Sequence, residues 1–207
     1  MKKLNMGTEI IESLKGLETE WQENELAYYA LTTKAELPFR DKLSWRMHKQ
    51  LEKEGVISSR EWKRTDLALI KDHEPLALIE LKNMLASDSF INTWGNFKDE
   101  QFFCEMLNDK IKAKKLANDK TEVYTLLTVT HSHNIIEDAN PASTAVKYRK
   151  DINRRLRLNT QEEILKEVDA RVVNNLEKFG DIVYSDVMDA GTTFDTDVSI
   201  MVYLVKC

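Results

Sequence analysis

The amino-acid sequence predicts an α/β protein built from a helix, three strands, a helix and a fourth strand, followed by further helices and two more strands. Three observations lead to this prediction. Apolar residues recur at three- and four-residue steps in several long segments, as in amphipathic helices. Short runs rich in Leu, Ile and Val stand between polar turns, as in strands. Helices and strands do not alternate one by one, which excludes a doubly wound βαβ arrangement.

The first part of the chain begins with two predicted helices. Residues 8–33 and 37–54 both show the helical spacing of apolar side chains. Pro38 stands in the first turn of the second helix, where proline is favoured, and Gly55 follows its last turn. The next elements are predicted in the order strands 56–62, 64–70 and 75–82, loop 83–96, helix 97–117 and strand 122–130.

The C-terminal part, from about residue 145 to 207, adds further helices and two strands. Thr160 and Glu163 have the spacing of a capping box at the start of a helix. Strands are expected near 181–187 and 197–205, with the loop "MDAGTTFDT" between them. A chain of 207 residues can bury a core of its own, and we expect a single domain over residues 1–207.

Charge and cysteine content bound the class of protein. The net charge of −5 is not that of a protein that is basic throughout, as many nucleic-acid binders are. Cys104 and Cys207 have neither the spacing of metal ligands nor that of a disulfide framework, which predicts a reducing, cytoplasmic environment. No apolar run approaches the roughly 20 residues of a membrane span, so no membrane association is expected.

Basic residues are concentrated in one segment, "KYRKDINRRLR" at 147–157. On a helix, one face would carry four of them: Lys147, Lys150, Arg154 and Arg157. This face can contact nucleic-acid phosphates, or it can be an ordinary solvated face. The sequence leaves both interpretations open.

Three charged residues interrupt the apolar strands 64–70 and 75–82. Glu80 and Lys82 are two positions apart and therefore share a face of the sheet. If the hairpin is symmetric about His73, Asp66 lies opposite Glu80, and all three charges meet on one face. The opposed pairs would be Ile70 with Leu76, Ala68 with Leu78 and Asp66 with Glu80.

This arrangement suits the chemistry of a divalent cation. Two adjacent carboxylates repel each other unless a cation lies between them. Oxygen ligands of this kind suit Mg²⁺, which can activate a water and offset charge on a phosphate. Lys82 would then deprotonate or orient the water, or hold the phosphate as a point charge. The alternatives are an ion-pair cluster without chemistry and an exposed strand face.

The pattern D-x13-E-x-K, formed by Asp66, Glu80 and Lys82 on a hairpin after a helix, resembles the PD-(D/E)XK nuclease superfamily. The resemblance covers about residues 23–130 and implies a restriction-endonuclease-like core of helix, three strands, helix and strand. Thr65 precedes Asp66 where the family pattern has proline. The resemblance implies an endonuclease that hydrolyses the phosphodiester bonds of DNA with Mg²⁺, for which Mn²⁺ can substitute, of the restriction or defence type.

The resemblance also implies supporting residues. Glu36 would be the acid from the first helix, although an acid there also favours the positive end of a helix dipole. Gln101, at the start of the helix after the third strand, would touch the site or a phosphate. Arg60 and Arg64 would contact phosphates. The alternative is that both arginines pair with Glu61 on the surface.

Partners follow from the same resemblance. DNA is the expected partner, and a homodimer would be needed to cut both strands because one site cuts one strand. Two alternatives remain: a non-catalytic nucleic-acid-binding member of the fold, and a member whose charged patch binds another protein.

A histidine pair, His131 and His133, is the remaining candidate for a metal site. Both imidazoles share one strand face, but no third ligand is apparent in the sequence. We expect an exposed pair at the end of a strand rather than a transition-metal site.

Overall fold

The structure is a computed structural model that describes residues 4–89, 92–93, 96–97 and 99–207. The helices are α1 (Met6–Lys15), α2 (Glu25–Thr32), α3 (Glu36–Leu51), α4 (Asp99–Leu116), α5 (Arg149–Leu156) and α6 (Gln161–Leu176). Short 3-10 turns are η1 (Leu17–Glu20), η2 (Glu52–Glu54), η3 (Ala86–Ser89) and η4 (Pro141–Thr144). The strands are β1 (Ile57–Trp62), β2 (Thr65–Lys71), β3 (Glu74–Leu85), β4 (Asn92–Thr93), β5 (Asn96–Phe97), β6 (Glu122–Ser132), β7 (Asp181–Thr193) and β8 (Thr196–Lys206).

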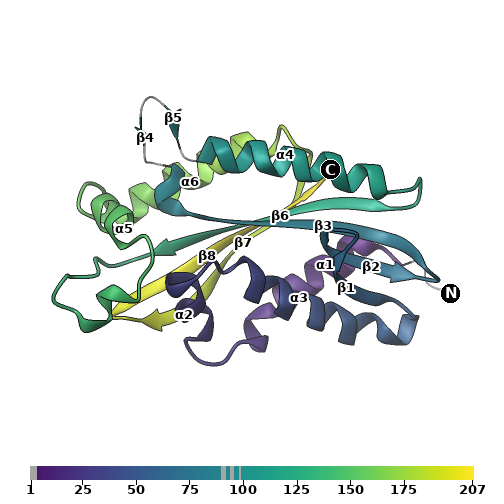
Figure 1. Ribbon diagram of the computed structural model, residues 1–207, viewed down its shortest axis with the longest axis horizontal. Helices are drawn as coiled ribbons and strands as arrows, with labels where there is room; N and C mark the ends of the chain where they lie inside the picture. The colour runs from purple at the N-terminus through teal and green to yellow at the C-terminus, as the bar shows by residue number, and fades with distance from the viewer. Residues whose placement is uncertain (1–3, 90–91, 94–95, 98) are drawn as a thin grey trace.

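The described residues form an α/β protein with a mixed six-stranded sheet in the order β1-β2-β3-β6-β8-β7. Strands β3 and β6 are parallel, and the other neighbours are antiparallel. The parallel pair requires a crossover, which α4 supplies. In Figure 1, α4 and α6 lie along one face of the sheet and α1 and α3 lie along the other. The predicted α/β class is therefore confirmed, and the predicted order of elements holds except that residues 8–33 form two helices and that β4 and β5 lie between β3 and α4.

Alternation along β2 and β3 divides the core between these two faces. Leu67 and Ile79 belong to the large cluster that also contains the apolar residues of α1, α2 and α3. Ala68 and Leu78, one position away, pack with Ala113 of α4. Successive side chains of a strand point to opposite faces. Even-numbered positions of β3, including Glu80 and Lys82, therefore face α4.

Three sequence predictions of element boundaries are wrong. Residues 8–33 are not one helix, because α1 ends before Gly16 and Asn24 adopts a left-handed conformation with φ 61° before α2. The predicted loop 83–96 begins with the end of β3 and then η3; part of it lies outside the described residues. The predicted loop 188–196 is mostly strand, because β7 and β8 pair up to a two-residue turn at Phe194 and Asp195.

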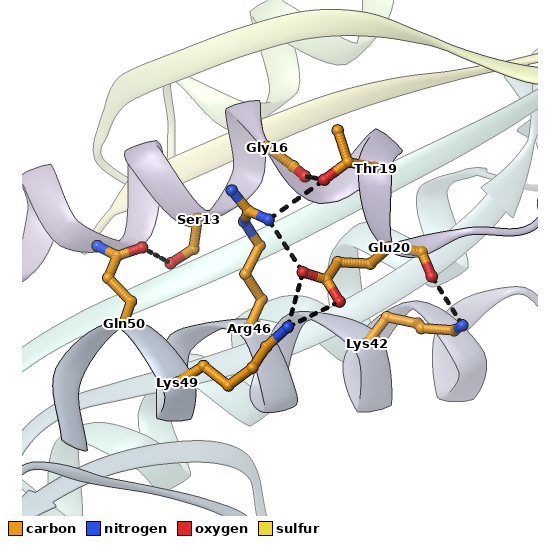
Figure 2. A network of polar contacts seen from close by, with 8 residues as sticks. All are labelled: Ser13, Gly16, Thr19, Glu20, Lys42, Arg46, Lys49 and Gln50. Carbon is orange, nitrogen blue, oxygen red and sulfur yellow. Dashed lines mark hydrogen bonds and ion pairs between the residues drawn. The ribbon is translucent and has the colours of Figure 1, made fainter.

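A polar network fixes η1 on α3 (Figure 2). Glu20 accepts hydrogen bonds from Arg46 at 3.0 Å and from Lys49 at 3.1 Å, and Lys42 donates to the Glu20 backbone carbonyl at 2.8 Å. The hydrogen bond from Lys49 is the main reason that the pKa of Glu20 is lowered, with Arg46 contributing further. These contacts are made by one side of α3, and the first turn of the same helix carries Glu36 to the candidate site.

None of the helices in the described part of the chain is both long enough and apolar enough to cross a lipid bilayer.

Candidate active site

A β-bulge in the hairpin of β2 and β3 decides which residues face each other. Next to the turn, Ile70 pairs with Pro75, and the register then shifts by one residue between Leu69 and Ile70. The expected pair of Ile70 with Leu76 is therefore wrong. Beyond the bulge, Ala68 pairs with Leu78, as predicted. A bulge of this kind inserts one unpaired residue and changes which side chains share a face.

The shifted register brings Asp66 next to Glu80. The Glu80 carboxyl group interacts with the Asp66 side chain, both through the charge of Asp66 and through a side-chain hydrogen bond. Glu80 is 7% exposed. Burial is the main reason that its pKa is raised, and the charge of Asp66 is the next; together with weaker contributions they raise it to about 8. Such a pair holds a proton or a cation between its oxygens near neutral pH.

Two carboxylates take the place of a neighbouring strand along the edge of β3. The pairing of β2 with β3 ends near Glu80, so the next backbone N–H groups of β3 need other acceptors. Leu81 N donates to Asp66 Oδ2 at 2.8 Å, and Asn83 N donates to Glu36 Oε2 at 3.1 Å. Each carboxylate is thereby held in place by one of its oxygens.

Glu36 is the first residue of α3 and points to the edge of β3. Burial raises its pKa and the charge of Asp66 raises it further, while Lys82 and the Asn83 backbone N–H lower it. Electrostatic coupling to both Asp66 and Lys82 places Glu36 in the same charge cluster. The structure therefore brings together all four residues that the sequence singled out: Glu36, Asp66, Glu80 and Lys82.

Lys82 forms its ion pairs with helix α4. Its ammonium lies 3.1 Å from Asp109 Oδ2 and 3.8 Å from Glu105 Oε2. Burial alone would lower the pKa of Lys82, but the hydrogen bond and charge of Asp109, with Glu36 and Glu105, more than offset it and the pKa is raised. In this arrangement Lys82 stays an ammonium, which favours the role of a cation over that of a base.

The acidic residues of α4 are the part of the site that sequence reasoning missed. Gln101 Nε2 donates to Glu105 Oε1 at 3.0 Å, and Glu105 in turn faces Lys82. Gln101, Glu105 and Asp109 are spaced four residues apart and so follow one face of α4. This spacing is visible in the sequence, but a polar stripe on a helix is usually read as a solvated face.

Of the two arginines beside β2, Arg60 is directed away from the carboxylate pair, and Arg64 lies in the turn before β2. Arg60 pairs with Leu67 in the ladder of β1 and β2 and forms an ion pair with Asp41 of α3 at 3.0 Å, not with Glu61. Arg64 is exposed in the β1–β2 turn with φ 73°. Arg60 is therefore directed to the α3 side of the sheet, opposite to the face that carries Glu80.

The basic segment lines a hollow, and three of the four residues predicted to share a face, Lys150, Arg154 and Arg157, line it together. α5 begins at Arg149 because Tyr148 adopts φ 59°, so Lys147 lies before the helix and the prediction is wrong for it. The basic hollow has a volume of about 440 Å³. It is lined by Arg149, Lys150, Arg154, Arg157, Asp138, Asn153 and Leu158.

The carboxylate oxygens of Asp66 and Glu80 suit a hard cation that also keeps water ligands. In the part of the chain that the structure describes, no group of three or more His, Cys, Asp or Glu side chains could hold a metal ion. This argues against a site made only of side chains. Mg²⁺ commonly takes one or two carboxylates and keeps several waters. Asp66 and Glu80, which repel each other as a metal-free pair, match that requirement.

Of the two histidines, His131 is buried and His133 is partly exposed. His131 is 3% exposed, so the expectation of an exposed pair is wrong for it. Burial, with the charge of His133, lowers the pKa of His131 to about 4. The rings of His131 and His133 lie 5.0 Å apart, and His133 Nε2 shares a hydrogen bond with Ser199 Oγ at 2.9 Å. No third metal ligand is found among the described side chains.

Comparison with known proteins assigns no relationship to this chain: no family model, no curated protein and no solved structure matches it.

Proposed function

We propose that this protein is a metal-dependent nuclease that hydrolyses phosphodiester bonds of DNA, and that residues 23–130 form a restriction-endonuclease-like core. The observation that carries the proposal is the contact between the Asp66 and Glu80 carboxyl groups, with Lys82 two residues along the same face of β3. Keeping the buried Glu80 beside Asp66 costs free energy, because burial and the charge of Asp66 both disfavour ionisation of Glu80. A bound divalent cation would offset this cost.

The four residues divide the work as follows. Asp66 and Glu80 would hold Mg²⁺ or Mn²⁺, which when bound supplies an activated water and stabilises charge on the phosphate. Asp66 is oriented by the Leu81 N–H and Glu36 by the Asn83 N–H. Glu36 would orient a water ligand of the cation. Lys82 would leave Asp109 and bind the scissile phosphate as an ammonium.

The order of the elements also supports the proposed core. α3 is followed by β1, β2 and β3, then by α4 and by β6, which pairs with β3 in parallel. β8 and β7 extend the same sheet on the far side of β6. Both cysteines are free thiols, which fits the cytoplasmic location that we propose. Cutting both strands of a duplex would still require two copies of the chain.

One observation favours a second candidate, a non-catalytic member of the same fold. Asp66 and Glu36 each accept a hydrogen bond from the edge of β3, and this role needs no metal. A protein of this kind would bind nucleic acid or another protein but would not cut DNA.

Plasmid cleavage separates the two candidates. Purified full-length protein with Mn²⁺ or Mg²⁺ is expected to convert supercoiled plasmid to nicked or linear forms, and EDTA is expected to prevent this. Asp66→Asn keeps the shape of the side chain but removes the charge, so it should abolish both cleavage and the metal dependence. Wild-type protein that leaves the plasmid intact in both metals would favour the non-catalytic alternative.

The basic hollow should contribute to DNA affinity through phosphate contacts. Neutralising Arg154 and Arg157 together as glutamines is expected to reduce the salt slope of DNA binding by about two units, because each phosphate contact contributes about 0.9 to that slope. The measurement is fluorescence anisotropy at several salt concentrations. A matched control neutralises Lys114 and Lys115 of α4, which are also exposed. Equal slopes for both double variants would mean that the hollow is only solvated.

A further inference from the structure

A cavity of about 320 Å³ lies at the free edge of β3, one step beyond Lys82. This β3-edge cavity is lined by Thr33, Lys34, Asn83, Met84, Leu85, Asp88, Gln101, Phe102 and Tyr148. Its volume lies in the range of pockets that hold small organic groups. It has two aromatic side chains, and its polar positions include one lysine, two amides and the carboxylate of Asp88; this composition suits a planar, amphipathic ligand.

The cavity is joined to the candidate active site by direct contacts. Asn83, in its lining, donates its backbone N–H to Glu36 at 3.1 Å. Gln101, also in its lining, donates to Glu105, whose carboxylate faces Lys82 at 3.8 Å. A group in the cavity would therefore be separated by a single residue, Asn83 or Gln101, from Glu36 and from the acid that faces Lys82.

Tyr148 offers the stacking surface of the cavity. Its ring is half-exposed and makes no aromatic contact in the described part of the chain. Its backbone is fixed, because its carbonyl accepts hydrogen bonds from Asp151 N at 2.9 Å and from Ile152 N at 3.1 Å. A ring on a fixed backbone loses little conformational entropy when a flat group stacks on it. α5 starts at the next residue and carries the basic side chains of the hollow.

We propose that the β3-edge cavity binds one unpaired nucleobase of the substrate strand, stacked on Tyr148. The proposal rests on the nuclease function above and specifies its substrate as single-stranded DNA or a single-stranded segment. Stacking on an aromatic ring accepts every base, and the neighbouring phosphates would lie between Lys82 and the basic hollow. A base inside a duplex cannot enter the cavity without leaving the stack, so paired DNA should bind more weakly.

The test uses full-length protein in EDTA, where no cleavage occurs. The probe is a short single-stranded oligonucleotide with one central 2-aminopurine, alone or annealed to its complement. Wild-type protein should bind the single strand at least about tenfold more tightly than the duplex and change its 2-aminopurine fluorescence. Tyr148→Ala should weaken single-strand binding about tenfold or more and remove the fluorescence change.

Two controls separate stacking from loss of folding. Tyr148→Phe keeps the ring and should bind like wild type. Tyr28→Ala removes a tyrosine of nearly equal exposure, 51% against 50%, outside the cavity lining, and should also bind like wild type. Equal binding of single strand and duplex, an unchanged Tyr148→Ala protein, or no binding of either probe would overturn the proposal. Cleavage of plasmid by the same preparations is scored separately, so the nuclease can stand when the cavity proposal fails, and the reverse.

Discussion

Lys82→Ala is expected to lower the rate of DNA cleavage by about 10²–10⁴-fold and to leave metal affinity nearly unchanged. Lys82 lies two residues from Glu80 on the same face of β3, and its ammonium lies 3.1 Å from Asp109. Removing a positive charge does not weaken a cation site, whereas the phosphate loses its electrostatic partner. Cleavage rates and Mg²⁺ titration by calorimetry on the same preparations measure both effects.

Lys112→Ala is the matched control for this variant. Lys112 also pairs with Asp109, at 2.8 Å, but its side chain is 70% exposed, against 22% for Lys82. It should therefore cleave at the wild-type rate. Asp66→Ala, in contrast, should lose metal binding and cleavage together. If Lys82→Ala cleaves at the wild-type rate, the assignment of Lys82 fails and its ion pairs with α4 are structural.

Glu80→Gln is expected to raise the melting temperature of the metal-free protein at pH 8 by about 5 °C or more. The pKa of Glu80 is raised from 4.5 to about 8 in the folded state. Between these values the folded protein binds more protons than the unfolded chain, so the free energy of unfolding falls as the pH rises. Glutamine cannot ionise and can donate to Asp66, so the variant avoids this loss. The gain should shrink towards pH 5.

Magnesium and a second glutamate provide the controls. Mg²⁺ should raise the melting temperature of the wild type at pH 8, because it binds only the folded state, and should do so much less in Glu80→Gln. Glu122→Gln on the neighbouring strand should have the opposite sign. Despite burial, hydrogen bonds from Lys206 and Tyr124 lower the pKa of Glu122, so removing its charge costs stability at pH 8. A lower melting temperature for Glu80→Gln at pH 8, with an unchanged response to Mg²⁺, would contradict a like-charged pair that binds a cation.

Local patterns in the sequence were sufficient for several parts of the structure. The side chains of Glu80 and Lys82 share a face because strand residues alternate, whatever the strand packs against. The capping box of Thr160 and Glu163 forms as predicted because both partners lie in one turn. Gly55 ends the α3 segment with φ 72°, a conformation that glycine adopts without strain. Each of these features depends on residues only a few positions apart.

The contact of Asp66 with Glu80 depends on a feature that local pattern does not specify. The turn has two residues, Asp72 and His73, with φ 51° and 67°, and sets a register in which Asp66 would not face Glu80. The core requires Leu67 and Ile79 on one face. One bulged residue, Leu76 of β3, which lies opposite the step from Leu69 to Ile70, satisfies both requirements. The symmetric hairpin therefore gave the right pair near the site and the wrong pair near the turn.

What the sequence determined by itself is the α/β class, the order of the six long strands with α3, α4 and α6 among them, and which acids and which lysine lie on the hairpin. The tertiary structure decided how those groups are used. Packing of α4 on β3 gives Lys82 its partners Asp109 and Glu105, and the start of α3 brings Glu36 to Asn83. These contacts join residues 23, 27 and 47 positions apart, and their geometry follows from how whole helices dock on the sheet. The pattern of apolar residues in a single helix or strand shows which of its faces is buried. It does not show how two elements dock, because the same buried faces can pack in many relative positions.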